Sequence, residues 1–323
     1  MKVNLIIGAG QLGSRHLQGL LKYSESQDIY VLDPSLESLK LAEGRSLEIE
    51  NNHQVIFTQK WMDLPSTFDL AIVATNSDVR EEVVKYLITN YTVKNLILEK
   101  VLFQEIGAYE RIGEILKHYK VPTWVNHPRR MFDSYKWVKS FFRTSERKII
   151  QITGGNWGLG CNALHFLDLI VYLTDNELVK INADLLNNSI IESKRKGFIE
   201  FTGSITGMLN DGSSFKITSL EGDSSAVTIT IFDSSTRLIV QETGTPQMLI
   251  LKKSNAFDLE LLPFKMEYQS SLTTKLAEDI FRKKECDLPT YDLSARAHIL
   301  FIREILRKYN EIIGLNQVKL PVT

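Results

Sequence analysis

The chain of 323 residues has few of the features that mark disulfide-bonded or nucleic-acid-binding proteins. Cys161 and Cys286 are its only cysteines, too few for a disulfide framework in a chain of this length. Lys and Arg number 38 against 39 Asp and Glu, so there is no surplus of positive charge to attract a phosphate backbone. We therefore expect reduced thiols and no nucleic-acid partner.

Long apolar runs are also missing. The most apolar stretch, residues 164–173, contains His165 and Asp168 and is far shorter than the roughly 20 residues that cross a bilayer. The first residues, with Lys2 before a short apolar run, lack the long apolar region and the small-residue cleavage site of a signal peptide. We expect a cytosolic protein that does not enter a membrane.

The rest of the composition is that of an ordinary globular protein. Hydrophobic residues make up 43% and charged residues 24% of the chain, which excludes a disordered or fibrous class. At roughly 150 residues per domain, the length predicts about two domains, each with its own core.

Roughly the first 120 residues alternate short apolar runs with longer helical patterns, which is typical of a parallel sheet with helices on its faces. One helix should begin near Asp78, a possible cap with Glu81 three residues on, and should bury Val79, Val83 and Leu87. The predicted strands cover residues 3–7, 29–32, 55–58, 70–74, 96–98 and 123–125.

The pattern changes after about Pro128. Strands now alternate apolar and polar residues, and residues 210–212 (Asn-Asp-Gly) predict a tight turn between two of them. Helices are predicted over residues 163–172, 272–281 and 294–310. We therefore expect an α/β protein: a doubly wound parallel sheet over residues 1–123, then an α+β domain over 124–323 with a mainly antiparallel sheet.

Gly8, Gly10 and Gly13 form a GxGxxG motif directly after the first predicted strand and at the start of a helix. The first glycine allows a tight turn, the second lets the backbone approach a pyrophosphate, and the third lets the helix pack on the strand. We expect these glycines, with Gln11 and Leu12 between them, to bind a dinucleotide in a Rossmann domain. The alternative is that the glycines only turn a loop.

Asp33 ends the second predicted strand, 20 residues after Gly13. A carboxylate at this distance from the motif accepts hydrogen bonds from the adenosine ribose and repels a 2′-phosphate, which favours NAD over NADP. Alternatively, Asp33 caps the helix that follows Pro34.

Thr75 and Asn76 follow the fourth strand at the carboxyl edge of the predicted sheet, where open α/β folds hold ligands. Either side chain could contact the cofactor. The alternative is that both only precede a helix.

Glu99 and Lys100 end the fifth predicted strand, at the same edge. Together with the glycines and His16, which give the pattern GxGxxGxxH, they resemble the Gfo/Idh/MocA oxidoreductases, whose EKP motif Glu99 and Lys100 match. Val101 stands where that motif has proline. His165 and Asp168, after a glycine-rich segment, match a third feature of the family, HxxD.

This resemblance covers essentially the whole chain. It implies a Rossmann domain followed by a domain for substrate binding and oligomerisation, in a dimer or tetramer. It also implies hydride transfer between a nicotinamide and a secondary alcohol or carbonyl of a sugar, cyclitol or nucleotide sugar. Lys100 is then the acid/base and, with Glu99, lies at the cofactor, while His165 faces the substrate.

Chemistry supports a lysine in this role. Oxidation of a hydroxyl requires removal of its proton as the hydride leaves, and a partly desolvated amine beside a cationic ring gives up its own proton more easily. The alternative is that Lys100 forms only a structural salt bridge.

His165 is expected near the start of a helix capped by Asn162, either relaying a proton or binding a hydroxyl. It could also be a structural histidine, and Asp168 could orient it. The family often has an aspartate four residues before this histidine, where this chain has Cys161, a weak hydrogen-bond partner. Cys161, His165 and Asp168 could also bind a metal, but the spacing is cramped and no second cluster is near, so we expect no metal.

Four further residues are candidates for substrate binding. Arg129 and Arg130 stand at the domain junction, where a guanidinium could hold a phosphate or carboxylate, although a solvated junction explains them equally well. Trp157 could stack on a sugar and Asn162 could hydrogen-bond to it, although Trp157 could also belong to the core.

A regulatory protein is the rival interpretation. The resembling family includes sugar-responsive repressor partners that keep the fold without turnover, and Cys161 and Val101 depart from the catalytic pattern. Lys100 and His165, which are present, favour an enzyme.

Overall fold

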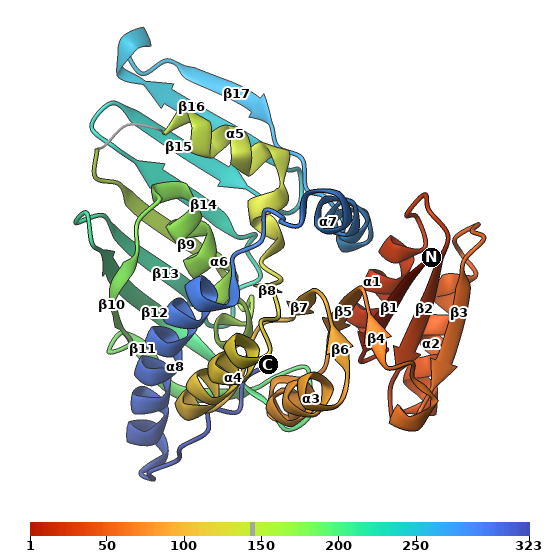
Figure 1. The fold of residues 1–323 in the computed structure, drawn as a ribbon. Coiled ribbons are helices and arrows are strands. Elements are labelled where there is room, and N and C mark those ends of the chain that lie inside the picture. Colours follow the sequence, from red (N-terminus) through yellow and green to blue (C-terminus); the bar gives the residue numbers. More distant parts are fainter. Residues whose placement is uncertain (143–145) are drawn as a thin grey trace. The chain divides into compact units, whose positions relative to one another are not determined.

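The computed structural model describes residues 1–142 and 146–323, which form two compact units (Figure 1). Unit 1 comprises residues 1–103, 107–128 and 267–295, and unit 2 comprises residues 104–106, 129–266 and 296–323. The predicted division into a dinucleotide-binding domain over residues 1–123 and a substrate-binding domain over residues 124–323 stays a prediction.

Unit 1 is built on a parallel sheet with the strand order β3-β2-β1-β5-β7-β8. The predicted strands are confirmed to within two residues at each end. Their bounds are β1 (Lys2–Ile7), β2 (Gln27–Leu32), β3 (Gln54–Thr58), β5 (Leu70–Val73), β7 (Leu96–Leu98) and β8 (Thr123–Val125). Because the order reverses between β1 and β5, the carboxyl ends of these two strands form the switch point where such sheets bind ligands.

Helices connect these strands and cover the sheet. They are α1 (Gln11–Leu20), α2 (Leu36–Ser46), α3 (Ser77–Asn90) and α4 (Ile106–His118), with a short turn η1 (Trp61–Asp63) and a small pair β4 (Thr67–Phe68) and β6 (Thr92–Val93). Helix α1 contacts α2, and an ion pair between Arg111 and Glu81 joins α4 to α3. Right-handed crossovers on either side of β1 place these two helix pairs on opposite faces of the sheet.

Helix α7 (Gln269–Lys283) also belongs to unit 1, where it packs against α1. The approach is close: a Cβ built on Gly19 would lie 2.5 Å from the Cβ of Thr273. Only a glycine therefore fits at position 19 with the two helices at this separation.

Helix α3 corrects one prediction. It begins at Ser77 with Asn76 as its N-cap, so Asp78 lies inside its first turn and is not the cap. Val79 is 48% exposed, and the buried stripe runs through Arg80, Val84 and Leu87. The predicted burial of Leu87 is confirmed and Val83 is half-buried, but the prediction is wrong for Val79, because the buried stripe at this end of the helix is centred on an arginine.

Unit 2 is built on a sheet with the order β10-β12-β13-β9-β14-β15-β16-β17, with β11 also paired to β12. All neighbours are antiparallel except β9 and β13, so the predicted mainly antiparallel sheet is confirmed, as is the turn at 210–212. The strands are β9 (Ile149–Gly155), β10 (Leu178–Asn182), β11 (Leu186–Glu192), β12 (Ile199–Leu209), β13 (Ser214–Leu220), β14 (Thr228–Phe232), β15 (Thr236–Gln241), β16 (Gln247–Lys252) and β17 (Leu259–Pro263).

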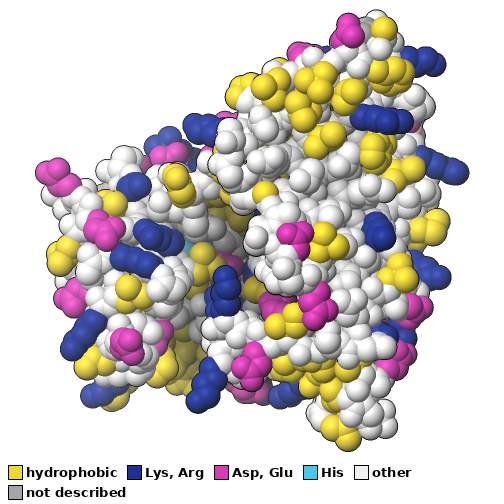
Figure 2. Space-filling model, turned by 180° about the vertical axis from the view of Figure 1, so that it is seen from behind, with side chains coloured by type: hydrophobic (Ala, Val, Ile, Leu, Met, Phe, Trp, Pro, Cys, Tyr) yellow, Lys and Arg dark blue, Asp and Glu magenta, His cyan; other side chains and the backbone are white. Residues whose placement is uncertain are grey.

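One face of this sheet is covered by helices. Helix α6 (Leu159–Thr174) packs on β12 and β13, and α5 (Asp133–Phe141) packs on α6; short turns η2 (Pro128–Met131) and η3 (Lys253–Asn255) complete the unit. On β9, Ile150 and Ile152 are buried, whereas Ile149 is 53% exposed on the other face. Leu259 and Leu261 of β17 are exposed too, and Figure 2 shows apolar side chains gathered over these strands.

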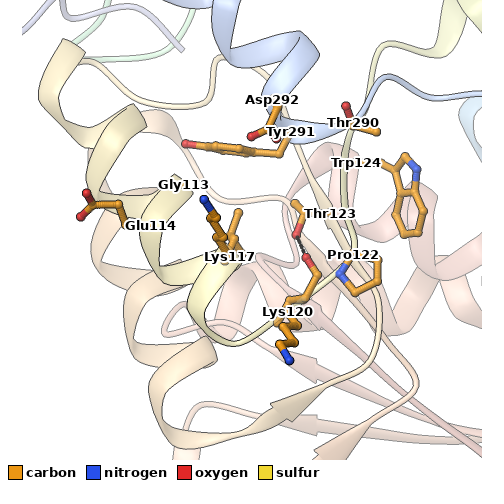
Figure 3. Close-up of a pocket in the computed structure, with 12 residues that line it drawn as sticks. Gly113, Glu114, Lys117, Lys120, Pro122, Thr123, Trp124, Thr290, Tyr291 and Asp292 are labelled. Atoms are coloured by element: carbon orange, nitrogen blue, oxygen red, sulfur yellow. Dashed lines mark hydrogen bonds between the residues drawn. The ribbon is translucent and has the colours of Figure 1, made fainter.

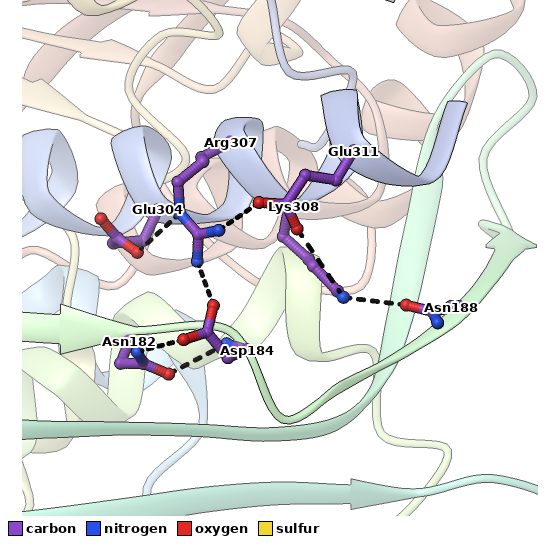
Figure 4. Close-up of polar contacts among 7 residues, drawn as sticks. All are labelled: Asn182, Asp184, Asn188, Glu304, Arg307, Lys308 and Glu311. Carbon is purple, nitrogen blue, oxygen red and sulfur yellow. Dashed lines mark hydrogen bonds and ion pairs between the residues drawn. The ribbon is translucent and has the colours of Figure 1, made fainter. Parts of the chain in front are cut away.

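Helix α8 (Tyr291–Ile313) begins in unit 1 and continues into unit 2. In unit 2 its polar side is tied to the connection between β10 and β11 (Figure 4). Arg307 donates to Asp184, and Nζ of Lys308 lies 2.8 Å from Oδ1 of Asn188. These exposed contacts fasten the helix at little energetic gain. Among the described residues, no helix is long and apolar enough to span a membrane.

Candidate active site

The GxGxxG motif forms a tight turn between β1 and α1. Gly8 has a φ of +96°, and a Cβ on Gly13 would lie 1.7 Å from the carbonyl oxygen of Gly8, so both positions require glycine. A Cβ on Gly10, in contrast, would have no heavy atom within 4 Å. The free space thus lies in front of the start of α1, where helix N–H groups and the helix dipole favour an anion.

Gln11 and Leu12 form the first turn of α1 and are the exposed part of this loop. Arg45 of α2 holds the turn from outside, donating from Nη1 to the carbonyl oxygen of Gln11 at 3.0 Å and to Oγ of Ser14 at 2.5 Å. Sequence analysis missed Arg45 because it lies 34 residues from Gln11.

Asp33, at the end of β2, is bound to the same turn. Its Oδ2 accepts a hydrogen bond from the backbone N–H of Ala9 at 2.7 Å, and its Oδ1 accepts one from Ser35 at 2.8 Å. Ser35, not Asp33, caps α2. The carboxylate is half-buried, and each oxygen keeps a lone pair for a further donor.

Thr75 and Asn76 follow β5, the neighbour of β1 in the sheet. Asn76 is exposed, whereas Oγ1 of Thr75 is buried and has no hydrogen-bond partner among the described residues. The carbonyl oxygen of Thr75 accepts from Arg80, a fully buried residue of α3.

Lys100 is the second residue after β7 and is half-buried. The Lys100–Val101 peptide bond is cis. Beyond it, Arg80 donates to the carbonyl oxygens of Val101 and Leu102, the latter at 3.2 Å. Arg80 therefore clamps the turns after β5 and β7 together, a role that its position in a helical pattern did not indicate.

Glu99, just before Lys100, lies in a buried polar network. Its Oε1 is 2.9 Å from Nε2 of His16 and accepts from Nδ2 of Asn126, while Nδ1 of His16 is 2.8 Å from Oγ1 of Thr273. Burial alone would raise the pKa of Glu99, but hydrogen bonds from His16 and Asn126 and the charge of Lys100 outweigh it and lower the pKa. Glu99 is therefore ionised next to Lys100.

These residues fit a bound NAD. The open space at Gly10 suits a pyrophosphate, Asp33 suits an unphosphorylated ribose, and the buried Thr75 hydroxyl has a hydrogen bond to offer.

In unit 2, His165 and Asp168 lie inside α6 rather than at its start. The helix begins at Leu159 after Gly158, which has a left-handed φ of 76°, so Asn162 is not the cap. Its Nδ2 instead donates to the carbonyl oxygen of Trp157 at 2.8 Å. The prediction failed because a glycine turn starts the helix four residues earlier. His165 is half-buried.

Arg129 and Arg130 each meet a carboxylate within unit 2. Arg129 donates from Nε and Nη2 to Glu242, both at 2.7 Å, and lies over the ring of Phe166. Arg130 donates in the same way to Asp168, at 2.7 and 2.8 Å. An anion at Arg129 would have to displace Glu242.

Glu242 completes a second buried charge network. Burial would raise the pKa of its carboxyl, but Arg129 and the hydroxyl of Tyr135, 2.6 Å away, outweigh this effect and lower it. Sequence analysis missed Glu242 because it lies 113 residues from Arg129.

Trp157 and Asn162 line one cavity of unit 2, together with Cys161. The cavity has a volume of about 540 Å³ and is otherwise mostly polar, with Glu200 and Ser219 on its wall. Nε1 of Trp157 donates to the carbonyl oxygen of Thr218 at 2.9 Å, which fixes the ring. The structure thus brings together two residues that were predicted separately to bind a sugar.

A larger cavity of about 710 Å³ lies in unit 1, between α4, the start of β8 and the start of α8 (Figure 3). Lys117, Trp124 and Tyr291 are among its lining residues, and none of the predicted site residues is. It opens at the amino end of β8, opposite the edge that carries Lys100. We therefore assign no part of the reaction to it.

No group of three His, Cys, Asp or Glu side chains that could hold a metal ion occurs in residues 1–142 and 146–323.

Comparison with known proteins identifies unit 1. The model of the Gfo/Idh/MocA family, described as oxidoreductases with an NAD-binding Rossmann fold, matches residues 3–127. The chain carries a Gfo/Idh/MocA Rossmann domain. Comparison with curated proteins found no matching sequence.

Solved structures share the fold of this chain over nearly its whole length. An oxidoreductase from Agrobacterium radiobacter, in complex with NAD+, L-tartaric acid and magnesium, superposes with a TM-score of 0.72 at 12% identity, covering 96% of this chain and 97% of that one. UDP-N-acetylglucosamine 3-dehydrogenase from Acidithiobacillus ferrooxidans gives 0.71 at 12%, covering 98% of both chains. A super-repressor mutant of the yeast protein Gal80p, from Saccharomyces cerevisiae, gives 0.74 at 16%, covering 98% and 97%.

Proposed function

We propose that this protein is an NAD-dependent oxidoreductase that transfers hydride between nicotinamide and a secondary alcohol or carbonyl of a sugar, cyclitol or nucleotide sugar. One observation carries the proposal: Lys100 lies just after β7 on the edge that holds the glycine turn, beside an ionised Glu99 whose Oε1 is hydrogen-bonded to His16 and Asn126. If Lys100 formed only a salt bridge at the surface, it would not have to lie at this edge of the sheet. Its neighbour Glu99 would not need buried hydrogen-bond partners either.

Lys100 is the acid/base of the reaction. In the oxidative direction its neutral amine takes the proton of the substrate hydroxyl as the C–H bond breaks and the carbonyl forms. The proton then rests on Nζ until water removes it. In the reductive direction the ammonium form polarises the carbonyl and returns the proton. NAD, when bound, supplies the hydride acceptor or donor.

The cavity around Trp157, Cys161 and Asn162 is the proposed site for the sugar-like substrate, with His165 of the same helix assisting. Its polar side chains and two aromatic rings, those of Trp157 and Phe201, suit a ligand with many hydroxyls. NAD is preferred to NADP because Asp33 faces the ribose position.

The exposed apolar side chains on the second sheet, including Ile149, Leu259 and Leu261, support association into a dimer or tetramer through that face. Cys161 and Cys286 are thiols and not partners in a disulfide, and the proposed location is the cytosol. Light scattering of the wild type and of Leu261→Glu tests this point, because the charge should shift the oligomer towards monomer.

A second candidate function is regulation by bound NAD and sugar without turnover. Cys161 favours it, because a thiol replaces the carboxylate expected in that cavity and is a weak hydrogen-bond partner.

A redox assay separates the two functions. The protein is mixed with NAD+ or NADH and a panel of sugars, cyclitols and nucleotide sugars, and the absorbance of the reduced nicotinamide is followed. The proposed enzyme changes this absorbance with at least one compound. Binding without any redox change across the panel would instead support the regulator.

A further inference from the structure

Asn126, which follows β8, is a buried amide whose orientation is fixed by its neighbours. Its Nδ2 donates to Oε1 of Glu99 and to Oε1 of Gln269, the latter at 3.0 Å. Because an ionised carboxylate only accepts hydrogen bonds, the nitrogen must face Glu99 and the oxygen must point the other way. The Asn126 side chain is 2% exposed.

Oδ1 of Asn126 is left without a donor. It is buried, and none of the described residues gives it a hydrogen bond. Buried acceptors in this condition are rare in native proteins, and each calls for an explanation. In the network around Glu99, Nε2 of Gln269 donates to Oγ1 of Thr273 and not to this oxygen.

The place of Asn126 in the sheet suggests the missing donor. Along the carboxyl edge, Asp33 follows β2, the glycine turn follows β1, Thr75 follows β5, Lys100 follows β7 and Asn126 follows β8. With the adenosine at β2 and the pyrophosphate at β1, the nicotinamide half of the dinucleotide extends over β5, β7 and β8. Beyond its ribose, the one hydrogen-bond donor of that half is the carboxamide NH2 group.

We propose that Asn126 is a cofactor-binding residue whose Oδ1 accepts a hydrogen bond from the nicotinamide carboxamide. This inference rests on the proposed NAD-dependent function. Glu99 then acts on the cofactor through Asn126, since it fixes which end of the amide faces the ring. The same contact would set the rotation of the carboxamide and hence the orientation of the ring beside Lys100.

The test compares NADH with its reduced 3-acetylpyridine analogue, in which a methyl group replaces the NH2. Dissociation constants are measured by titration calorimetry with the full chain, so no turnover is needed. Wild type should bind NADH roughly tenfold more tightly than the analogue, the effect of about one hydrogen bond. Asn126→Leu should bind both compounds equally, whereas Asn90→Leu, the matched control at an exposed asparagine that ends α3, should keep the preference.

The outcomes separate this inference from the proposed function. If wild type binds both compounds with the same affinity, Asn126 does not bind the carboxamide, although NAD binding stands. Retention of the preference in a folded Asn126→Leu variant overturns the inference as well. If neither compound binds, both the inference and the NAD-dependent function are wrong. The wild-type comparison decides the question even if Asn126→Leu does not fold.

Discussion

Nε2 of His16 lies 2.9 Å from Oε1 of Glu99, and the exposed fractions of the two side chains are 0% and 2%. His16 belongs to α1, near the start of the chain, and Glu99 directly follows β7 and precedes the proposed acid/base. The glycine motif and the Glu99–Lys100 pair, which sequence analysis treated as separate features, are therefore parts of one buried structure.

We predict that His16→Ala destabilises the protein by about 3–5 kcal/mol, because it leaves the carboxylate of Glu99 buried without its imidazole partner. Urea unfolding followed by circular dichroism measures the change. His118→Ala, at an exposed helix end, is the control and should alter the free energy of unfolding by no more than about 0.5 kcal/mol. A loss below about 1 kcal/mol for His16→Ala would show that the pair contributes little.

The Arg129–Glu242 pair should make stability depend on acid pH. The pKa of Glu242 is lowered in the folded state, so its contribution is present above the unfolded value of about 4.3 and is lost as the pH falls through the folded pKa. Glu242→Gln should cost about 3–5 kcal/mol at pH 7. The difference from wild type should narrow below about pH 4.

Urea unfolding of both proteins at pH 7, 5 and 3 measures this effect. Glu260→Gln removes an exposed partner of Lys252 and should cost less than about 1 kcal/mol at each pH. A difference for Glu242→Gln that stays constant from pH 7 to 3 would contradict the expected ionisation of Glu242.

Asp33 should set the choice of cofactor. Asp33→Asn keeps an oxygen for the Ala9 N–H but removes the charge that repels a 2′-phosphate, so it should narrow the preference for NADH over NADPH by about tenfold or more. Fluorescence titration gives both dissociation constants. Asp33→Ala should narrow the preference as well while loosening the glycine turn, and an unchanged ratio in both variants would remove Asp33 from the site.

Arg80 should position Lys100 through the carbonyl oxygens of Thr75 and Val101. Arg80→Gln is expected to lower turnover at least about tenfold, since a misplaced catalytic group reduces the rate steeply. Val101→Pro in that background should recover part of the loss, because proline, the residue of the EKP motif, restricts the backbone that Arg80 no longer holds. Arg111→Gln, which breaks the exposed pair with Glu81, is the control and should leave turnover unchanged. If the effects of Arg80→Gln and Val101→Pro on turnover were additive, the two residues would act independently. That result would argue against the positioning of Lys100 by Arg80.

How far the sequence predicts the structure depends on how many residues of the chain separate the two partners of a contact. The six parallel strands and the glycine turn follow from short patterns, and the structure confirms them. The contact of His16 with Thr273 joins residues 257 apart, and no local pattern indicates that helix α7 packs on α1. Arg80 and Glu242 were missed for the same reason, because a buried charge is recognised only by its partners.

Helix starts were the least predictable local feature. The predicted start of α3 near Asp78 is confirmed, but its cap is Asn76. For α6 the predicted cap, Asn162, lies inside a helix that begins at Leu159. At α6 the left-handed backbone of Gly158 determines the start, and a glycine carries no side-chain signal of a cap.

Replacement of the proposed acid/base tests the central claim most directly. For Lys100→Met, NADH binding and turnover are measured together, with Lys94→Met, an exposed lysine of the same domain, as the control. The account predicts that Lys100→Met binds NADH within a few-fold of wild type while turnover falls by about 100-fold or more, and that the control retains both. Turnover near the wild-type rate in Lys100→Met would contradict the assignment of the acid/base to Lys100.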